Sequence, residues 1–311
     1  KLYALNHDGT PVAGSWPKAT GDLIRSSAAV GDLNGDGKNE VVVGSFDKKI
    51  YAFTRDGGLL PGWPVTTSGT ITSSPALADL DNNPNTLEIV IGSSDGYLYG
   101  LNYLGQPLGN NWPVALFDTG QTGLLDVDSS PAVADLDGDG VPEIVVGTDS
   151  GRVYAINAQG QVLPGWPVLT GGEVFASPVI GDLDRDGAPE ILVGSDVGSE
   201  IGQRSSIFLG LEVDGSPLAG FPLTFPIEEF GETRLRSSSI IRDLDGDGKM
   251  DFAVCLYLLG SDSGQVRLYE YEAGEIPVEE GTLQGTVRDG LTQNALSGAL
   301  LSFSNLQNIP L

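Results

Sequence analysis

The chain is dominated by short runs of apolar and β-branched residues that are separated by turns rich in glycine and proline. Runs such as EIVVG from Glu143 and RVYAI from Arg152 are bounded by Gly, Asp, Asn and Pro. This pattern is typical of β-strands, and the 44 glycines and 19 prolines fit a fold with many short turns. The pattern therefore predicts a large all-β unit.

An acidic pattern recurs five times along the chain. The first aspartates of successive copies are 47, 56, 47 and 61 residues apart. Such a period suits one four-stranded blade of a β-propeller per repeat. The copies read GDLNGDGKNEVVVG, ADLDNNPNTLEIVIG, ADLDGDGVPEIVVG, GDLDRDGAPEILVG and RDLDGDGKMDFAVC, and they start at Gly31, Ala78, Ala134, Gly181 and Arg242.

A second pattern follows each acidic copy and consists of a strand, a turn and an aromatic residue before proline. We interpret these aromatic residues as packing between blades rather than as a platform for sugars. They are Trp16, Trp63, Trp112, Trp166 and Phe221, with Ile276 in the corresponding place at the end.

The second pattern occurs six times, whereas the acidic pattern is clear only five times. The chain opens in mid-repeat with KLYALNHDG, and the tail from Ser297 reads as a degenerate first half with Ser302 and Ser304 at aspartate positions. We therefore predict a single domain over residues 1–311, a six-bladed β-propeller in which strands from both termini share one blade and leave no free sheet edge. The predicted blades cover residues 22–66, 67–115, 123–169, 170–223, 234–278, and 292–311 together with 1–18.

The acidic motif lies between the first and second strands of each blade and has the form D-x-[DN]-x-[DN]-G-x-x-[DE]. It places oxygen-bearing side chains at alternate positions of a tight loop, and calcium takes roughly six to eight oxygen ligands. A single loop of this kind would be an ordinary turn, but five copies at the spacing of propeller blades indicate that the loops bind a metal ion. In the third repeat the predicted ligands are Asp135, Asp137, Asp139, Glu143 and the backbone carbonyl of Val141.

The same roles recur in the other repeats, so about five calcium sites are predicted. In the second repeat Pro84 replaces the glycine and one extra residue delays the last acid, so we expect a weaker or distorted site there. The ligand positions are Asp32, Asn34, Asp36, Lys38 and Glu40; Asp79, Asp81, Asn83, Asn85 and Glu88; Asp182, Asp184, Asp186, Ala188 and Glu190; and Asp243, Asp245, Asp247, Lys249 and Asp251, where Lys38, Asn85, Ala188 and Lys249 contribute backbone carbonyls.

The charge balance agrees with bound cations and argues against nucleic acid as a partner. The chain has 42 acidic and 16 basic residues, a net charge of -26 and a pI near 4.1. Eighteen of the acids are predicted ligands, clustered where they repel one another when no cation is bound. We therefore expect stability to depend on calcium.

Other features narrow the class of protein. No run approaches the roughly 20 apolar residues of a membrane span. The chain starts at Lys1 without a methionine or signal segment, so we expect it to be part of a larger polypeptide.

Cys255 lies in an apolar run and is interpreted as core filling, and His7 is interpreted as a solvated turn residue. Because no nucleophile elbow, phosphate loop or histidine-rich metal motif is present, we expect no enzymatic activity.

The DLDGDGxPEIVVG cores and the LPGWPV segments from Leu60 and Leu163 resemble FG-GAP or VCBS repeats. These repeats form the propeller of integrin α-subunits and occur in many secreted bacterial proteins. The resemblance covers nearly the whole chain and implies a propeller fold with calcium-binding loops. The family includes adhesins, lectin-like modules and domains attached to enzymes, so the resemblance leaves the function open.

The larger insertions fall in the loops on the face opposite the acidic loops, at residues 115–127, 196–206 and 224–236. Variable loops on a rigid scaffold commonly bind ligands, although they can equally pack over the channel or contact a neighbouring domain. We expect an extracellular or cell-surface binding or adhesion module for a protein or glycan ligand; a structural spacer and a calcium-dependent polysaccharide lyase are the alternatives. The candidate contact residues are Phe117, Arg204, Phe225, Phe230, Arg234 and Arg236.

Overall fold

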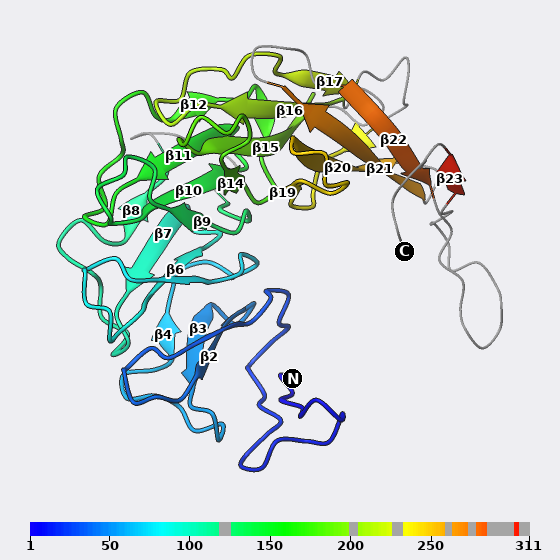
Figure 1. Ribbon diagram of the computed structural model, residues 1–311. Coiled ribbons are helices and arrows are strands. Elements are labelled where there is room, and N and C mark those ends of the chain that lie inside the picture. The colour runs from blue at the N-terminus through cyan, green and yellow to red at the C-terminus, as the bar shows by residue number, and fades with distance from the viewer. Residues whose placement is uncertain are drawn as a thin grey trace. The chain divides into compact units, whose positions relative to one another are not determined.

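The computed structural model describes residues 1–117, 126–198, 205–225, 233–258, 263–272, 278–284 and 302–304. Regular structure in these ranges consists of β-strands alone (Figure 1). Within them there is consequently no helix long and apolar enough to cross a membrane. The chain divides into two compact units, Lys1–Leu163 and Pro164–Leu311.

Three sheets have four antiparallel strands each, joined in the order in which they occur along the chain. The first contains β1 (Ala29–Gly31), β2 (Glu40–Ser45), β3 (Lys49–Phe53) and β4 (Val65–Thr66). The second contains β5 (Ala76–Ala78), β6 (Glu88–Gly92), β7 (Tyr97–Leu101) and β8 (Val114–Ala115). The third contains β9 (Ala132–Ala134), β10 (Glu143–Thr148), β11 (Arg152–Ile156) and β12 (Val168–Leu169).

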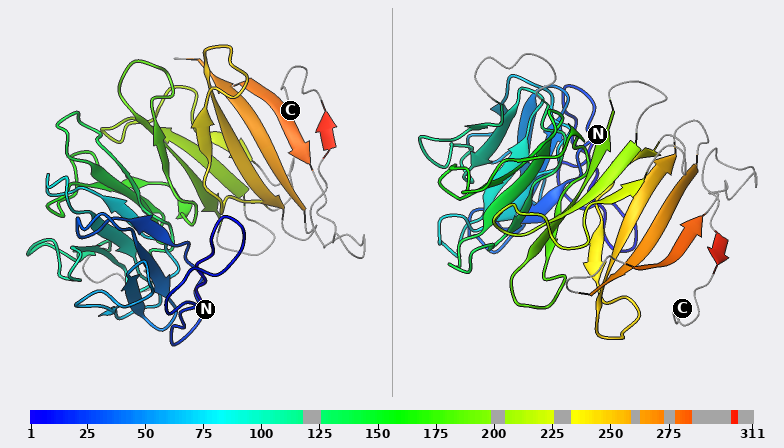
Figure 2. Two further views of the ribbon diagram at one scale, coloured as in Figure 1. Left: turned by 60° about the horizontal axis from the view of Figure 1, so that its bottom comes forward. Right: turned by 90° about the horizontal axis from the view of Figure 1, so that it is seen from above.

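The next two sheets are larger, and their long strands lie side by side in both views of Figure 2. The fourth sheet contains β13 (Gly172–Glu173), β14 (Val179–Gly181), β15 (Glu190–Val197), β16 (Ser205–Leu211) and β17 (Leu223–Phe225). The fifth contains β18 (Thr233–Arg234), β19 (Ile240–Arg242), β20 (Met250–Leu258), β21 (Ser263–Tyr271), β22 (Val278–Gln284) and β23 (Ser302–Ser304).

The prediction of an all-β fold built from four-stranded antiparallel sheets is confirmed. Residues 1–18 add a partial unit held by the bridges Leu2↔Lys18 and Leu5↔Pro11. In the tail, Ser302–Ser304 form β23, which pairs with β22 of the fifth sheet. The number of blades and the closure by both termini stay predictions.

In each of the first three sheets, the strand that follows the acidic loop is the most buried element. Every residue of β6 and β10 is buried, because another sheet or loop covers each side of the strand. Residues of β2 and β3 share a cluster with Ile89 and Ile91 of β6, and Val90 packs with Ile144 of β10. Burial on both faces explains why these runs are continuously apolar instead of alternating.

Glycine ends the apolar run of the second strands because the next repeat packs directly against it. A Cβ atom on Gly44 would lie 2.1 Å from Cγ2 of Ile71, and one on Gly92 would lie 2.6 Å from Cγ1 of Val127. Real Cβ contacts are never this short, so only glycine lets adjacent sheets approach so closely. The VVVG and IVIG patterns thus encode the spacing between sheets.

The tryptophans join neighbouring repeats, as their interpretation as packing residues requires. Trp63 Nε1 donates a hydrogen bond to the carbonyl of Tyr103 at 2.8 Å, and Trp112 Nε1 donates one to the carbonyl of Ala158 at 3.1 Å. Trp63 and Trp112 are both buried. Each ring therefore fills space in its own repeat and ties the hairpin of the next repeat to it.

Candidate metal centres

Strand pairing brings the first and last acids of each loop together. In the third repeat Ala134 of β9 is the register partner of Glu143 of β10. Asp135, which follows Ala134 directly, therefore lies beside Glu143, although seven residues lie between the two in the sequence. The equivalent pairs are Gly31↔Glu40, Ala78↔Glu88, Gly181↔Glu190 and Arg242↔Asp251.

Backbone N–H groups of the third loop hold its carboxylates in place. Asp135 accepts hydrogen bonds from the backbone N–H groups of Gly138 and Gly140, at 2.8 and 2.9 Å. Asp137 accepts one from Asp139 at 3.1 Å. Gly140 has φ +88°, so the turn here requires the glycine that the motif predicts. The loop is thus preformed, with oxygen atoms directed inward.

The predicted carbonyl positions take part in the same turn through their N–H groups. In the third loop Val141 N donates to Asp139 Oδ1 at 2.7 Å. This bond recurs at every loop, which gives the third side chain a structural role in all five repeats. The equivalent bonds run from Lys38 to Asp36, from Asn85 to Asn83, from Ala188 to Asp186 and from Lys249 to Asp247.

The last acid of each loop is buried. Glu143 Oε2 accepts a hydrogen bond from Leu136 N at 2.8 Å, which leaves its other oxygen for a further partner. Burial raises the pKa of Glu143, and the nearby charges of Asp137, Asp139 and Asp135 raise it further. Burial likewise raises the pKa of Glu190 to about 7. A bound cation would offset the cost of burying these negative charges.

Four loops bring one oxygen atom from each of three acids within 4.8 Å of one another. The third aspartates of the motif, such as Asp139, are not part of these groups. The first loop has Asn34 at the second position, and its amide oxygen accepts a hydrogen bond from Asp36 N at 3.0 Å. The groups are Asp79, Asp81 and Glu88; Asp135, Asp137 and Glu143; Asp182, Asp184 and Glu190; and Asp243, Asp245 and Asp251.

The fourth loop provides the most direct indication that a cation fits. Asp182 Oδ1 is buried and has no hydrogen-bond partner among the residues that the structure describes. It belongs to a group whose other members, Asp184 and Glu190, are also carboxylates. An oxygen-only donor set is what hard cations such as calcium prefer. The residues present therefore fit a calcium ion.

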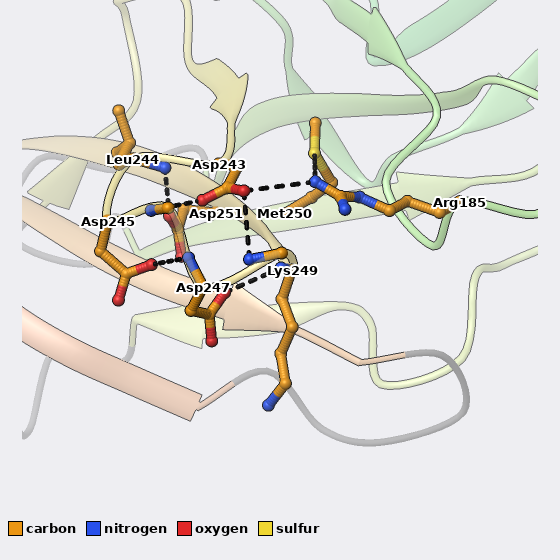
Figure 3. A network of polar contacts seen from close by, with 10 residues as sticks. Arg185, Asp243, Leu244, Asp245, Asp247, Lys249, Met250 and Asp251 are labelled. Carbon is orange, nitrogen blue, oxygen red and sulfur yellow. Dashed lines mark hydrogen bonds and ion pairs between the residues drawn. The ribbon is translucent and has the colours of Figure 1, made fainter.

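The fifth loop has a basic neighbour that the repeated pattern does not predict (Figure 3). Arg185, from the fourth loop, places Nη2 3.5 Å from Asp243 Oδ2 and 3.4 Å from the sulfur of Met250. Asp243 also accepts hydrogen bonds from Gly246 N and Gly248 N. Arg185 thus links two adjacent acidic loops within the second unit, and only the fold reveals this contact.

The second loop still brings its acids together despite its extra residue. Asp79 and Asp81 both accept a hydrogen bond from Asn83 N, at 2.9 and 3.0 Å. Asn82 adopts φ +61°, in a loop where Pro84 replaces the usual glycine. The weaker metal binding expected at this loop stays a prediction.

A further acidic group lies outside the repeated motif. Asp126, Asp128 and Asp149 place carboxylate oxygens within 4.8 Å of one another, and the Thr72 hydroxyl donates a hydrogen bond to Asp128. The sequence signal is the D-x-D in LLDVDSS, which falls at the entry to the first strand of the third sheet. Because this D-x-D does not recur in the other repeats, the repeated pattern does not predict the group.

The candidate contact residues in the insertions have different environments. Phe225 is 2% exposed and belongs to the core of the second unit, so its assignment as a ligand contact is wrong. The reason is that β17 pairs with β16 and turns this side chain inward. Phe117 is half-buried and packs edge-on against Tyr97, with ring centroids 5.3 Å apart. Arg204 and Phe230 lie outside the described residues.

The two remaining arginines border a buried carboxylate. Asp196 is 1% exposed and accepts hydrogen bonds from Leu235 N and the Ser206 hydroxyl. Burial raises the pKa of Asp196, and the positive charges of Arg234 and Arg236 act against that rise. Arg236 is exposed and lies over the Phe175 ring at 4.2 Å. Arg236 is therefore the described candidate most accessible to a ligand.

Comparison with solved structures defines the class of fold. The chain is similar to the V. cholerae biofilm matrix protein Bap1 (TM-score 0.50, 19% identity, 84% of this chain and 39% of that chain). It is also similar to the quinohemoprotein alcohol dehydrogenase ADHIIG from Pseudomonas putida HK5, with a TM-score of 0.57 and 14% identity over 93% of this chain and 46% of that chain. Saccharomyces cerevisiae Sqt1 is a third similar structure, with a TM-score of 0.51 and 14% identity over 78% of this chain and 57% of that chain. These proteins are β-propeller-like, and this chain shares that fold.

Two stretches of the chain match a known type of repeat. Residues 32–85 and 135–193 match the FG-GAP-like repeat, so the chain contains FG-GAP-like repeats, as the sequence resemblance predicted. No curated protein matches the chain. The chain spans 39% to 57% of the length of the three similar structures.

Proposed function

We propose that this chain is a calcium-stabilised binding or adhesion module that works outside the cell or at its surface, as part of a larger polypeptide. The observation that carries the metal proposal is the oxygen-only cluster of the fourth loop, in which Asp182 Oδ1 is buried and has no hydrogen-bond partner among the described residues. The FG-GAP-like repeats and the likeness to a biofilm matrix protein support the adhesion role.

Calcium would be held by the first, second and last acids of each loop, with the amide of Asn34 taking the second position in the first loop. The ion supplies positive charge where carboxylates are crowded and partly buried. Because these oxygens belong to the loop between two strands of one sheet, ion binding would fix that connection. Removing calcium should therefore lower the stability of the whole chain.

A ligand would bind on the face opposite the acidic loops, where Arg236 is exposed beside Phe175. The test is binding of the purified chain to an array of glycans and matrix proteins, in calcium and again in chelator. Binding that is lost in the Arg236→Ala variant supports this face. If the folded protein binds nothing on the array, a structural spacer is favoured. If a ligand binds and Arg236→Ala leaves that binding unchanged, a ligand site on this face is excluded.

The closure of a six-bladed ring is part of the proposal. Val30 is 58% exposed, whereas its counterpart in the second repeat, Leu77, is partly buried and packs near Gly31 of the first sheet. Tyr3 and Leu5 of the N-terminal segment are 64% and 58% exposed. A strand from the C-terminal tail would cover this apolar surface. Deleting residues 292–311 should then destabilise the chain.

We also propose that the chain is not an enzyme. His7 is exposed in its turn, as the sequence indicated, and Cys255 is partly buried in β20. The test is an assay with uronate polysaccharides, in which formation of an unsaturated product would establish lyase activity and contradict this proposal.

A further inference from the structure

The first unit contains a cleft of about 630 Å³ on the side of the acidic loops. One wall is formed by Leu80 and Asp81 at the start of the second acidic loop, another by the turn of the same sheet around Asn110, and the third by Gln159 of the next sheet. We propose that this cleft binds a neutral saccharide. This ligand site is distinct from the one proposed on the opposite face.

Two departures from the repeated sequence pattern meet at this cleft. The second acidic loop is one residue longer than the others, at residues 79–88. The connection to the aromatic residue is also longer, because three residues, 109–111, separate Leu108 from Trp112. The first, third and fourth sheets have two residues there, such as Pro164 and Gly165. Neither departure is needed for the fold, since the neighbouring sheets form without it.

The cleft has fixed walls. Asn111 Nδ2 donates a hydrogen bond to the carbonyl of Gln159 at 2.9 Å, and Trp112 Nε1 donates one to the carbonyl of Ala158 at 3.1 Å. Asn102 Oδ1 accepts hydrogen bonds from two backbone N–H groups of its own turn, both at 3.0 Å. The bonds of Asn111 and Trp112 tie the two sheets together, and those of Asn102 hold its turn, so ordering the cleft would cost a ligand little free energy.

Amide groups give the cleft its chemistry. The side chains of Asn110 and Gln159 are exposed and make no hydrogen bond with another described residue. Each primary amide offers two donors and an acceptor, which matches the hydroxyl groups of a sugar, since these both donate and accept. Pro107 and Leu108 supply apolar surface for the C–H face of a sugar ring.

Charge selects a neutral ligand over an anionic one. Asp81 is the only charged residue among those that line the cleft. A uronate or sulfated sugar would find no basic side chain in this lining and would meet a chain of net charge -26. A second cleft, between residues 1–18 and the first sheet, contains Lys38 and Arg55 and lacks this neutral lining. The amide lining therefore distinguishes the cleft at Asn110.

The test is titration calorimetry of the full chain, in calcium, with the neutral hexasaccharides of glucose, mannose and N-acetylglucosamine, and with hexaguluronate and an uncharged hexapeptide. We expect at least one neutral saccharide to bind, and the double variant Asn110→Ala, Gln159→Ala to bind it about tenfold more weakly. Gly109→Trp should abolish binding, since a Cβ at this position has no atom within 4 Å and a large side chain can occupy the cleft. Gln106→Ala, on the same turn but outside the cleft, should bind normally.

Binding of no neutral saccharide at millimolar concentration would overturn the proposal, as would binding that survives Gly109→Trp. Binding of hexaguluronate or the peptide that is lost in Gly109→Trp would also overturn it, because the ligand class would be wrong. Melting curves of each variant check that it is folded. The calcium dependence of melting and any binding at Arg236 should be the same in Gly109→Trp, so failure here is distinguishable from failure of the proposed function.

Discussion

The substitution Asp137→Asn separates the structural role of an acidic loop from its role as a metal site. Asp137 Oδ1 accepts a hydrogen bond from Asp139 N, and the amide oxygen of asparagine can accept the same bond. The change removes one negative charge from the group of Asp135, Asp137 and Glu143. Without calcium the variant should therefore be as stable as the parent chain, or slightly more stable, because repulsion between carboxylates is reduced.

In calcium the same variant should lose stability. A site with a dissociation constant of about 0.1 mM contributes about 1.4 kcal/mol at roughly 1 mM calcium. If losing one carboxylate weakens binding about tenfold, that contribution falls to about 0.4 kcal/mol, a loss of about 1 kcal/mol. For a cooperative unit of this size the melting temperature should fall by about 2 to 4 °C.

The assay is urea or thermal unfolding of parent and variant, each in calcium and in chelator. Asp8→Asn is the matched control, because Asp8 lies in an exposed turn outside the acidic loops and bonds to Thr10 in the same manner. The control should behave as the parent in both conditions. A loss for Asp137→Asn that is equal in calcium and in chelator, or no loss in either, would refute the reasoning.

Three further substitutions test the packing and the closure. Gly44→Ala should lower the free energy of unfolding by about 1 to 3 kcal/mol, because its Cβ would overlap Ile71. The control Gly109→Ala should change that free energy by less than about 0.5 kcal/mol, because a Cβ there has no atom within 4 Å. Equal changes for the two variants in urea unfolding would contradict this prediction. Trp112→Phe should cost about 1 to 3 kcal/mol because it leaves a carbonyl of the next sheet without its donor, and a neutral result would exclude the hydrogen bond as a stabilising contact. Val30→Asp should destabilise the full chain by about 2 kcal/mol if the tail covers this residue, and by less than about 0.5 kcal/mol if it stays exposed.

The sequence predicted the strands and the acidic loops well because both are local and repeated. The order of four strands follows from runs such as EIVVG, and the proximity of Asp135 and Glu143 follows from the pairing of the strands that flank the loop. Five copies of the motif made each assignment stronger than a single copy could.

Contacts between repeats could not be predicted in the same way. Arg185 reaches Asp243 from a position 58 residues earlier, and Asn111 reaches Gln159 from one 48 residues earlier. Phe225 was assigned to a ligand-binding loop, but the extension of β16 and β17 places it in the core. Such contacts depend on how far each strand continues and on how neighbouring sheets pack, which a repeated pattern does not encode.

If the acidic loops hold calcium, the stability of the fold depends on that ion. The decisive experiment is a set of melting curves of the full chain at constant ionic strength, in calcium, in magnesium and in excess chelator. Five sites of about 0.1 mM affinity would together contribute about 7 kcal/mol at roughly 1 mM calcium, so we expect a melting temperature in calcium well above that in chelator or magnesium. The same melting temperature in all three conditions would contradict it.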